Sequence, residues 1–254
     1  MISDIMPFKM YGNLYFVGSK KVSVHIIETK EGLVMIDTGY PEMYEQIIES
    51  IEYLGFDVKD ICAIFHSHGH YDHIGCTERF KEISGAKTYI SRIDNDIVNG
   101  KLNLSWAEEL KREILPFFDC DVLVEDGDTF TFGDTVIRCV LTPGHTDGVL
   151  SFFINVKEGD NEIIAAMHGG VGLNSMFTDF LEKRGLSFDC RRKFRDGLKM
   201  LKNEHVDLVM GNHPPQNDTE GKLKKVMAGE NIIDPGEWER FLTFREEECD
   251  KYFS

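Results

Sequence analysis

Residues 61–73 read ICAIFHSHGHYDH. The first five residues are apolar, which predicts a short strand buried on both faces of a sheet. The strand runs directly into a segment that holds four potential metal ligands within six residues: His68, His70, Asp72 and His73. Side chains that follow a buried strand lie at its carboxyl end, where α/β sheets carry their sites. The stretch therefore predicts a sheet and a site at its edge.

The spacing of these side chains favours a loop. On a helix, residues two apart face different directions, so His68 and His70 cannot share one helical face. A tight loop can turn all four side chains inward. Neutral imidazole is a good zinc ligand, and a carboxylate can complete a second site. The alternative, a solvated histidine-rich loop, is disfavoured by the density of ligands.

Two further histidines follow predicted strands. His145 lies in the segment TPGHT after a predicted strand at 136–141, and His213 lies in GNHP after one at 206–210. Three histidine-bearing strand ends in one chain predict one shared site. His168 also follows a predicted strand, and it either reaches this site or bonds a backbone carbonyl. We expect His66 to lie behind the site and the two remaining histidines, His25 and His205, to lie on the surface.

The hydrophobic pattern predicts strands and helices in two similar halves. Strands are expected at 14–17, 22–29, 33–36, 61–65, 88–90, 122–124, 129–132, 136–141, 150–156, 163–167 and 206–210. Helices are expected at 43–54, 76–83, 190–202 and 237–252. Because no Pro/Gly/Ser-rich linker divides the chain, we expect a single domain over 1–254. Two packed sheets with helices outside, a four-layer arrangement, fit this order.

Composition narrows the class of partner. The chain has 254 residues and a formal net charge of −16, which repels phosphate backbones and disfavours nucleic acid. No stretch is apolar for long enough to predict a membrane span. The six cysteines form no C-x-x-C pair, and the N-terminus has no secretory signal pattern. We therefore expect a cytoplasmic protein with reduced thiols, although a secreted form with its leader removed would look the same.

The order H-x-H-x-D-H, then G-H-T, then a late strand-end histidine resembles the metallo-β-lactamase superfamily over nearly the whole chain. Residues 35–39, Met-Ile-Asp-Thr-Gly, resemble the early aspartate-glycine turn of that family. Residues 169–174 and 231–235 resemble segments of the subclass-three metallo-β-lactamases. The resemblance implies an α/β fold, a four-layer αββα sandwich with mixed β-sheets.

The resemblance also implies a binuclear site with two Zn2+ ions per chain. The implied ligands of the first zinc are His68, His70 and His145. The implied ligands of the second are Asp72, His73 and His213. Asp72 would also orient the nucleophile, and Asp37 would either support the ligands or only shape its turn. Gly170 stands where many members have a bridging carboxylate or a cysteine, so a bridging hydroxide should suffice.

We therefore expect a binuclear zinc hydrolase that cleaves a cyclic amide (β-lactam-like) or related acyl bond of a small molecule, with a metal-bound hydroxide as nucleophile. His168 is the further catalytic candidate. Gly170 and Gly172 replace the serines that hold the drug's carboxylate in subclass-three enzymes, which weakens the inference to β-lactams. The alternative is a lactonase or thioesterase, like the hydroxyacylglutathione hydrolases, with little or no β-lactamase activity.

Three other functions are less compatible with the sequence. A di-iron protein on the same scaffold would have carboxylates in place of some histidines. A nuclease is disfavoured by the net charge of −16. A binding module without activity is disfavoured because all six implied ligands are present.

Overall fold

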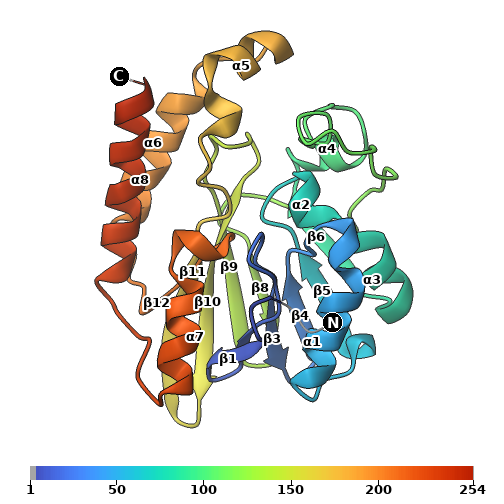
Figure 1. The fold of residues 1–254 in the computed structure, drawn as a ribbon, viewed down its shortest axis with the longest axis vertical. Helices are drawn as coiled ribbons and strands as arrows, with labels where there is room; N and C mark the ends of the chain where they lie inside the picture. The colour runs from blue at the N-terminus through green and yellow to red at the C-terminus, as the bar shows by residue number, and fades with distance from the viewer. Residues whose placement is uncertain (1–3, 254) are drawn as a thin grey trace.

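The computed structural model describes residues 4–253, so residues 1–3 of the N-terminus and residue 254 lie outside it. Two sheets lie face to face at its centre (Figure 1). The first sheet has the order β1-β2-β3-β4-β5-β6-β7, with β1 (Phe8–Tyr11), β2 (Leu14–Phe16), β3 (His25–Thr29), β4 (Gly32–Ile36), β5 (Ile61–Phe65), β6 (Lys87–Ser91) and β7 (Val122–Val124). The second has the order β12-β11-β10-β9-β8, with β8 (Thr129–Phe132), β9 (Thr135–Leu141), β10 (Leu150–Glu158), β11 (Asn161–Met167) and β12 (Leu208–Met210).

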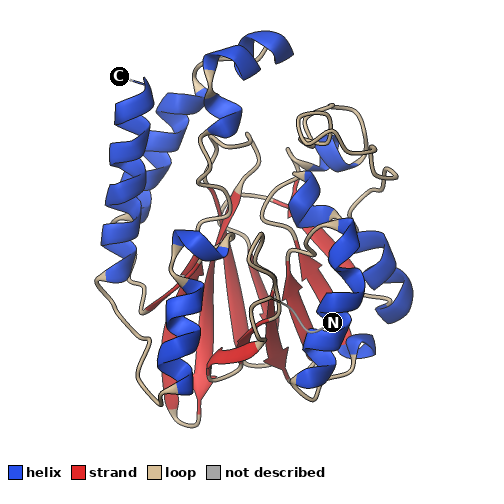
Figure 2. Ribbon diagram, viewed as in Figure 1, coloured by secondary structure: helices blue, strands red, loops and turns tan. Residues whose placement is uncertain are grey.

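Helices cover the outer faces of both sheets (Figure 2). The first sheet packs against α1 (Tyr44–Tyr53) and α3 (Thr77–Ser84), and the second packs against α6 (Cys190–Leu201) and α8 (Glu237–Phe253). The other helices are α2 (Tyr71–Ile74), α4 (Asn95–Val98), α5 (Thr178–Arg184) and α7 (Thr219–Met227), with 3-10 turns at Pro41–Met43, Val58–Asp60, Asn174–Met176 and Pro214–Gln216. The predicted four-layer αββα class is confirmed.

Both sheets are mixed. Strands β4 to β7 run parallel to one another and β11 runs parallel to β12, while the remaining neighbours are antiparallel. Alternation along each strand divides its side chains between two apolar layers. On β10, for example, Phe152 and Ile154 face the layer between the sheets, whereas Phe153 faces α6 and α8.

Aromatic rings fill the centre of the layer between the sheets. Phe65 stacks on Tyr89 with ring centroids 4.2 Å apart. Its edges meet Phe130 at 5.4 Å, Phe132 at 6.0 Å and Phe152 at 6.0 Å. Phe65 is the last residue of β5 and stands directly before the histidine segment. The apolar core therefore fixes the strand end from which the predicted site begins.

Several predicted elements differ from the observed ones. Strand β1 and the helices α4, α5 and α7 were not predicted, and the strand predicted at 22–29 begins only at His25. Residues 219–227 carry four lysine or glutamate side chains among nine residues, which hides the face that α7 packs onto the core through Leu223 and Val226. Short segments of this kind have too little periodicity to be recognised.

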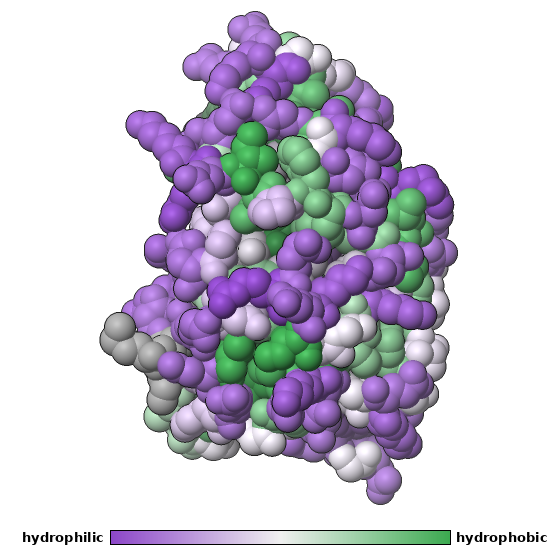
Figure 3. Space-filling model, turned by 90° about the vertical axis from the view of Figure 1, so that its right-hand side faces the viewer, coloured by the Kyte–Doolittle hydropathy of each residue, from purple (hydrophilic) through white to green (hydrophobic). Residues whose placement is uncertain are grey.

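The surface is mostly hydrophilic, as Figure 3 shows for the face at the right of Figure 1, with separate apolar patches. Exposed apolar side chains include Ile114 at 53 % and Phe117 at 60 %, both in the long loop between α4 and β7. Among the described helices, none has the length and apolar character needed to cross a bilayer.

We predict that Phe152→Ala lowers the free energy of unfolding by about 3–5 kcal/mol, because it opens a cavity among the stacked rings between the sheets. Phe244→Ala is the matched control, since Phe244 is 52 % exposed on α8, and its effect should stay within about 0.5 kcal/mol. Urea unfolding of both variants measures the difference. Equal effects of the two substitutions would contradict the assignment of Phe152 to the core.

Candidate metal centre

The predicted site residues come from loops and from the short helix α2, which meet at one end of the two sheets. Backbone hydrogen bonds tie these loops together: the Asp37 N–H donates to Phe65 O at 2.8 Å, and the Leu150 N–H donates to Ser67 O at 2.8 Å. The amide of Asn212, after β12, donates to the carbonyl of Gly169, after β11, at 2.7 Å. Strands distant in sequence therefore place their carboxyl-end side chains around one point.

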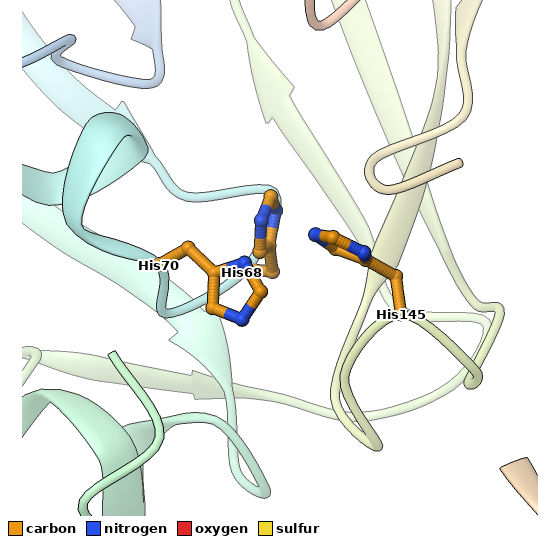
Figure 4. A group of neighbouring side chains, drawn as sticks. All are labelled: His68, His70 and His145. Atoms are coloured by element: carbon orange, nitrogen blue, oxygen red, sulfur yellow. The ribbon is translucent and has the colours of Figure 1, made fainter. Parts of the chain in front are cut away.

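The first group of ligands consists of His68, His70 and His145. Their rings turn toward one another, with His68 and His70 on one side and His145 opposite (Figure 4). Ring centroids are 4.6 Å apart for His68 and His70, and 4.5 Å apart for His70 and His145. All three side chains are buried, and each offers one nitrogen within 4.8 Å of the others.

The second group consists of Asp72, His73 and His213. Asp72 Oδ2 lies 3.5 Å from His73 Nε2 and 3.6 Å from His213 Nε2. The first two side chains lie on the short helix α2 rather than in the loop that the spacing predicted. Asp72 and His73 can lie on a helix, because the spacing argument requires a loop only for His68 and His70, which are two residues apart. The centroids of His68 and His73 are 4.3 Å apart, so the two groups are neighbours.

Hydrogen bonds hold the Nδ1 atoms of four of the five ligand histidines: His145, His213, His73 and His68. His145 Nδ1 donates to Gly172 O and His213 Nδ1 donates to Lys21 O, each at 2.7 Å. His73 Nδ1 donates to Asp37 Oδ2, also at 2.7 Å. When Nδ1 carries the proton, Nε2 presents its lone pair. These contacts therefore aim Nε2 at the common point.

Asp37 connects the two groups. Its carboxylate accepts from the Ser67 N–H and from Ser67 Oγ, each at 2.7 Å, and from His73 Nδ1. Since the Ser67 hydroxyl donates its one proton to Asp37, it can only accept from His68 Nδ1, which lies 3.0 Å away. One carboxylate thus sets the tautomers of His68 and His73. Asp37 holds this position in a left-handed turn with φ of 58°.

The electrostatics suit metal binding. Burial and neighbouring histidines lower the pKa of His68 and of His70 well below the usual value, and burial lowers the pKa of His145 to about 4. These rings are therefore neutral ligands at pH 7. Burial alone would lower the pKa of His73, but the carboxylates of Asp72 and Asp37 outweigh it and raise that pKa. The protein thus attracts positive charge here.

The donor set fits a pair of metal ions. Among the described residues, His68 Nε2 and His73 Nε2 are buried and have no hydrogen-bond partner. Buried polar atoms are almost always satisfied, so each such atom calls for a partner that the protein does not supply. Imidazole nitrogens with one carboxylate are typical zinc ligands. The two groups could therefore hold one metal ion each.

A family model described as the metallo-beta-lactamase superfamily matches residues 17–158. The chain belongs to the metallo-beta-lactamase superfamily. A solved structure of a subclass B3 metallo-beta-lactamase of Bradyrhizobium japonicum is similar over 98 % of this chain and 94 % of that chain, at 26 % identity and a TM-score of 0.85. The resemblance to the subclass-three enzymes predicted from the sequence is confirmed.

Curated relatives match part of the chain. A probable polyketide biosynthesis zinc-dependent hydrolase of Bacillus velezensis is 32 % identical over 129 residues, which are 50 % of this chain and 47 % of that protein. An N-acyl homoserine lactonase of Bacillus thuringiensis is 22 % identical over 163 residues, 55 % of this chain and 60 % of that protein. The first curated relatives are matched over 47–62 % of their own lengths.

The cleft of this superfamily member has two parts. The part over the second group is lined by Tyr40, His70, Asp72, His73, Trp106, Leu110, His145, Gly172, Asn174, Asn212 and His213. The other part adjoins His70 and His145 and has mainly apolar walls, which include Ile93, Ile97, Leu102, Leu104, Phe180, Leu181 and Leu186. The Trp106 ring lies 5.6 Å from His70 and 4.5 Å from Phe180, so it stands between the two parts.

The glycines at the serine positions lie close against a ligand. A Cβ added to Gly170 would lie 2.9 Å from His145 Cδ2, and one added to Gly172 would lie 2.7 Å from Asn174 Oδ1 and 3.1 Å from His145 Cε1. Ser175, the nearest serine, is used to hold His145 through the backbone oxygen and Nδ1 of that residue. A side chain at Gly170 would press on the ring of the ligand His145, and one at Gly172 would displace the end of the Asn174 side chain.

His168 lies beside the site but faces away from the cleft. Its ring is 1 % exposed and packs 6.0 Å from Phe194, and its Nδ1 accepts from the Gly170 N–H at 3.2 Å. It lines neither part of the cleft. Burial lowers its pKa to about 3. The catalytic role of His168 stays a prediction, and its contacts are those of a residue that supports the glycine loop.

The other histidines divide as follows. His66 is buried behind the site, as expected, with Nε2 3.2 Å from Thr77 Oγ1. His205 is exposed and contacts Asp207. The prediction that His25 lies on the surface was wrong, because His25 is 1 % exposed and packs against Phe16. In a strand that is buried on both faces, alternation does not indicate which polar residue is exposed.

One residue at the site was missed. Asp94 is 1 % exposed and accepts hydrogen bonds from the two loops of the first group. It lies in the segment 91–118, where the sequence has little periodicity. Asp94 is followed by Asn95 and Asp96, and nothing in this polar run distinguishes it from a helix cap, so its role is visible only in three dimensions.

We predict that Asp37→Asn weakens metal binding about 10–100-fold, as loss of a carboxylate behind a histidine ligand typically does. The amide lacks the charge and cannot accept all three hydrogen bonds. Competition with a chelator measures the affinity, and Asp134→Asn, at an exposed carboxylate paired with Lys30, is the control. Unchanged affinity in Asp37→Asn would show that His73 and His68 need no such support.

Proposed function

We propose that this protein is a zinc-dependent hydrolase with two Zn2+ ions, which cleaves a cyclic amide of the β-lactam kind or a related acyl bond in a small molecule. One observation carries the proposal. Two groups of ligands converge, and two of their nitrogen atoms, His68 Nε2 and His73 Nε2, are buried without a hydrogen-bond partner. A cleft that reaches both groups gives access to a substrate.

The chain's own residues would bind and orient the reactants. A zinc pair, when bound, lowers the pKa of water toward 7 and polarises an acyl carbonyl. Asp72 is 13 % exposed and faces the cleft, with Oδ2 between His73 and His213. It would hold the second metal and orient the attacking water. Trp106 and Tyr40 would exclude bulk water from the sides of the cleft.

The β-lactam substrate is supported by the similarity to subclass B3 enzymes but has no carboxylate anchor in the glycine loop. The lactonase or thioesterase alternative is favoured by the apolar part of the cleft, which suits an acyl tail, and by the similarity to the N-acyl homoserine lactonase. Its alkoxide or thiolate leaving group needs no charged anchor at Gly170 or Gly172. Both candidates use the same metal groups.

We predict that the purified protein contains two zinc ions per chain and hydrolyses acyl substrates, but β-lactams only weakly. Each missing charge-assisted hydrogen bond to the β-lactam carboxylate costs about 1.5–3 kcal/mol of binding, so the loss should appear mainly in KM. Elemental analysis and a hydrolysis screen over β-lactams, lactones and thioesters measure both expectations. Folded protein that binds no zinc after reconstitution would refute the proposal.

We predict that Asp72→Asn lowers kcat by orders of magnitude and leaves the fold intact. The substitution removes the only carboxylate among the six ligands and disturbs the orientation of the nucleophile. Turnover of the best substrate from the screen, with the melting temperature, measures the effect. Asp160→Asn, in the exposed turn between β10 and β11, is the control. Near-normal turnover in Asp72→Asn would place Asp72 outside the reaction.

A further inference from the structure

Asp94 is a buried carboxylate that lies outside both groups of metal ligands. It follows β6, directly before α4, and is 1 % exposed. Among the described residues, neither lysine nor arginine forms an ion pair with it; its partners are hydrogen-bond donors. A carboxylate buried without a counter-charge costs free energy, so its position calls for an explanation.

The hydrogen bonds of Asp94 supply that explanation. Asp94 Oδ2 accepts from the Gly69 N–H at 2.9 Å, and Gly69 stands between the ligands His68 and His70. The same oxygen accepts from Thr146 Oγ1 at 2.7 Å, and Thr146 follows the ligand His145. One oxygen atom therefore joins the two loops that carry all three ligands of the first group.

The surroundings of Asp94 are shaped for this contact. The Gly148 N–H, in the loop of His145, is a third donor to the carboxylate. A Cβ added to Gly148 would lie 2.3 Å from Asp94 Oδ1, so only glycine allows this approach. The Asp94 N–H in turn donates to Ser91 Oγ at 3.1 Å, which fixes the carboxylate relative to the end of β6.

We propose that Asp94 is the positioning residue of the first metal group: it holds the loop of His68 and His70 against the loop of His145 at the separation that one metal ion needs. The inference rests on the proposed metal centre and does not depend on which acyl bond is cleaved.

The negative charge of Asp94 would also favour a metal ion in the first group. Three neutral imidazoles bring no negative charge to the first group, whereas Asp72 supplies one to the second. A buried carboxylate behind the first group compensates part of the metal's charge at low local dielectric. Asp94 would therefore support the first metal by geometry and by charge, beside Asp37, which contacts His73 directly and His68 through Ser67.

Asp94→Asn tests the proposal. The amide keeps the shape but turns an N–H toward at least one of the donors, so the two loops lose a contact. Zinc affinity is measured by competition with a chromogenic chelator in a His213→Ala background, where the second group is incomplete. We expect Asp94→Asn to weaken binding about 10–100-fold. The control is Asp96→Asn, at the exposed carboxylate on α4 that pairs with Lys101.

Thr146 gives a second, milder test that does not alter Asp94. Thr146→Val removes the hydroxyl donor at nearly constant shape and should weaken zinc binding in the same assay. Thr146→Ser keeps the hydroxyl and should retain most of the wild-type zinc affinity. In the double variant, Asp94→Asn with Thr146→Val, the losses should be less than additive, because the two substituted side chains are the donor and the acceptor of the same hydrogen bond.

The outcomes separate this inference from the proposed function. Wild-type zinc affinity in both Asp94→Asn and Thr146→Val would overturn it, as would a fall in melting temperature with unchanged affinity, which marks a purely structural carboxylate. If the wild-type protein binds two zinc ions but hydrolyses nothing in the screen, the proposed function fails and the role of Asp94 is still decided by the affinities. If the wild type binds no zinc, both are refuted.

Discussion

The packing of the two sheets against each other is the constraint on which the site depends. His68 and His70 follow a strand of the first sheet, and His145 follows a strand of the second. Their rings can meet only if the strand ends keep a fixed separation. The stacked aromatic layer around Phe65 sets that separation, because close-packed interiors resist even small displacements. The apolar core therefore does more than stabilise the chain: it places ligands from distant segments around one point.

Three aspartates at this point have different roles because their surroundings differ. Asp72 is partly exposed, faces the cleft and lies beside two imidazoles, so it can bind a metal ion directly. Asp37 and Asp94 are 1 % exposed and are occupied by hydrogen bonds from ligands or from their neighbours. The resemblance to the family separated Asp72 from Asp37 in advance, but nothing in the sequence pointed to Asp94. Access and the number of donors around each carboxylate decide whether it binds a metal ion or orients the residues that do.

The sequence predicted the parts of this arrangement that are local. The run from His68 to His73, and the strand ends before His145 and His213, were visible because apolar strands and polar loops alternate there. The helix α2 was not expected, because the loop that the spacing of His68 and His70 requires was assumed for Asp72 and His73 as well. His25 was placed wrongly because its strand is buried on both faces. Asp94 was missed because its partners lie 25 and 52 residues away, and no local pattern encodes such contacts.

The buried carboxylates also link metal binding to the stability of the fold. Among the described residues, Asp37 and Asp94 are paired with hydroxyl, amide and imidazole groups, and neither has a lysine or arginine partner. Asp94 in particular is buried without a cation, which is costly, so negative charge stays uncompensated at this end of the sheets in the metal-free protein. Divalent cations in the two neighbouring groups would supply the missing positive charge, and binding that favours only the folded state stabilises it. Metal binding at the two groups would therefore stabilise the folded chain through the same contacts that orient the imidazoles.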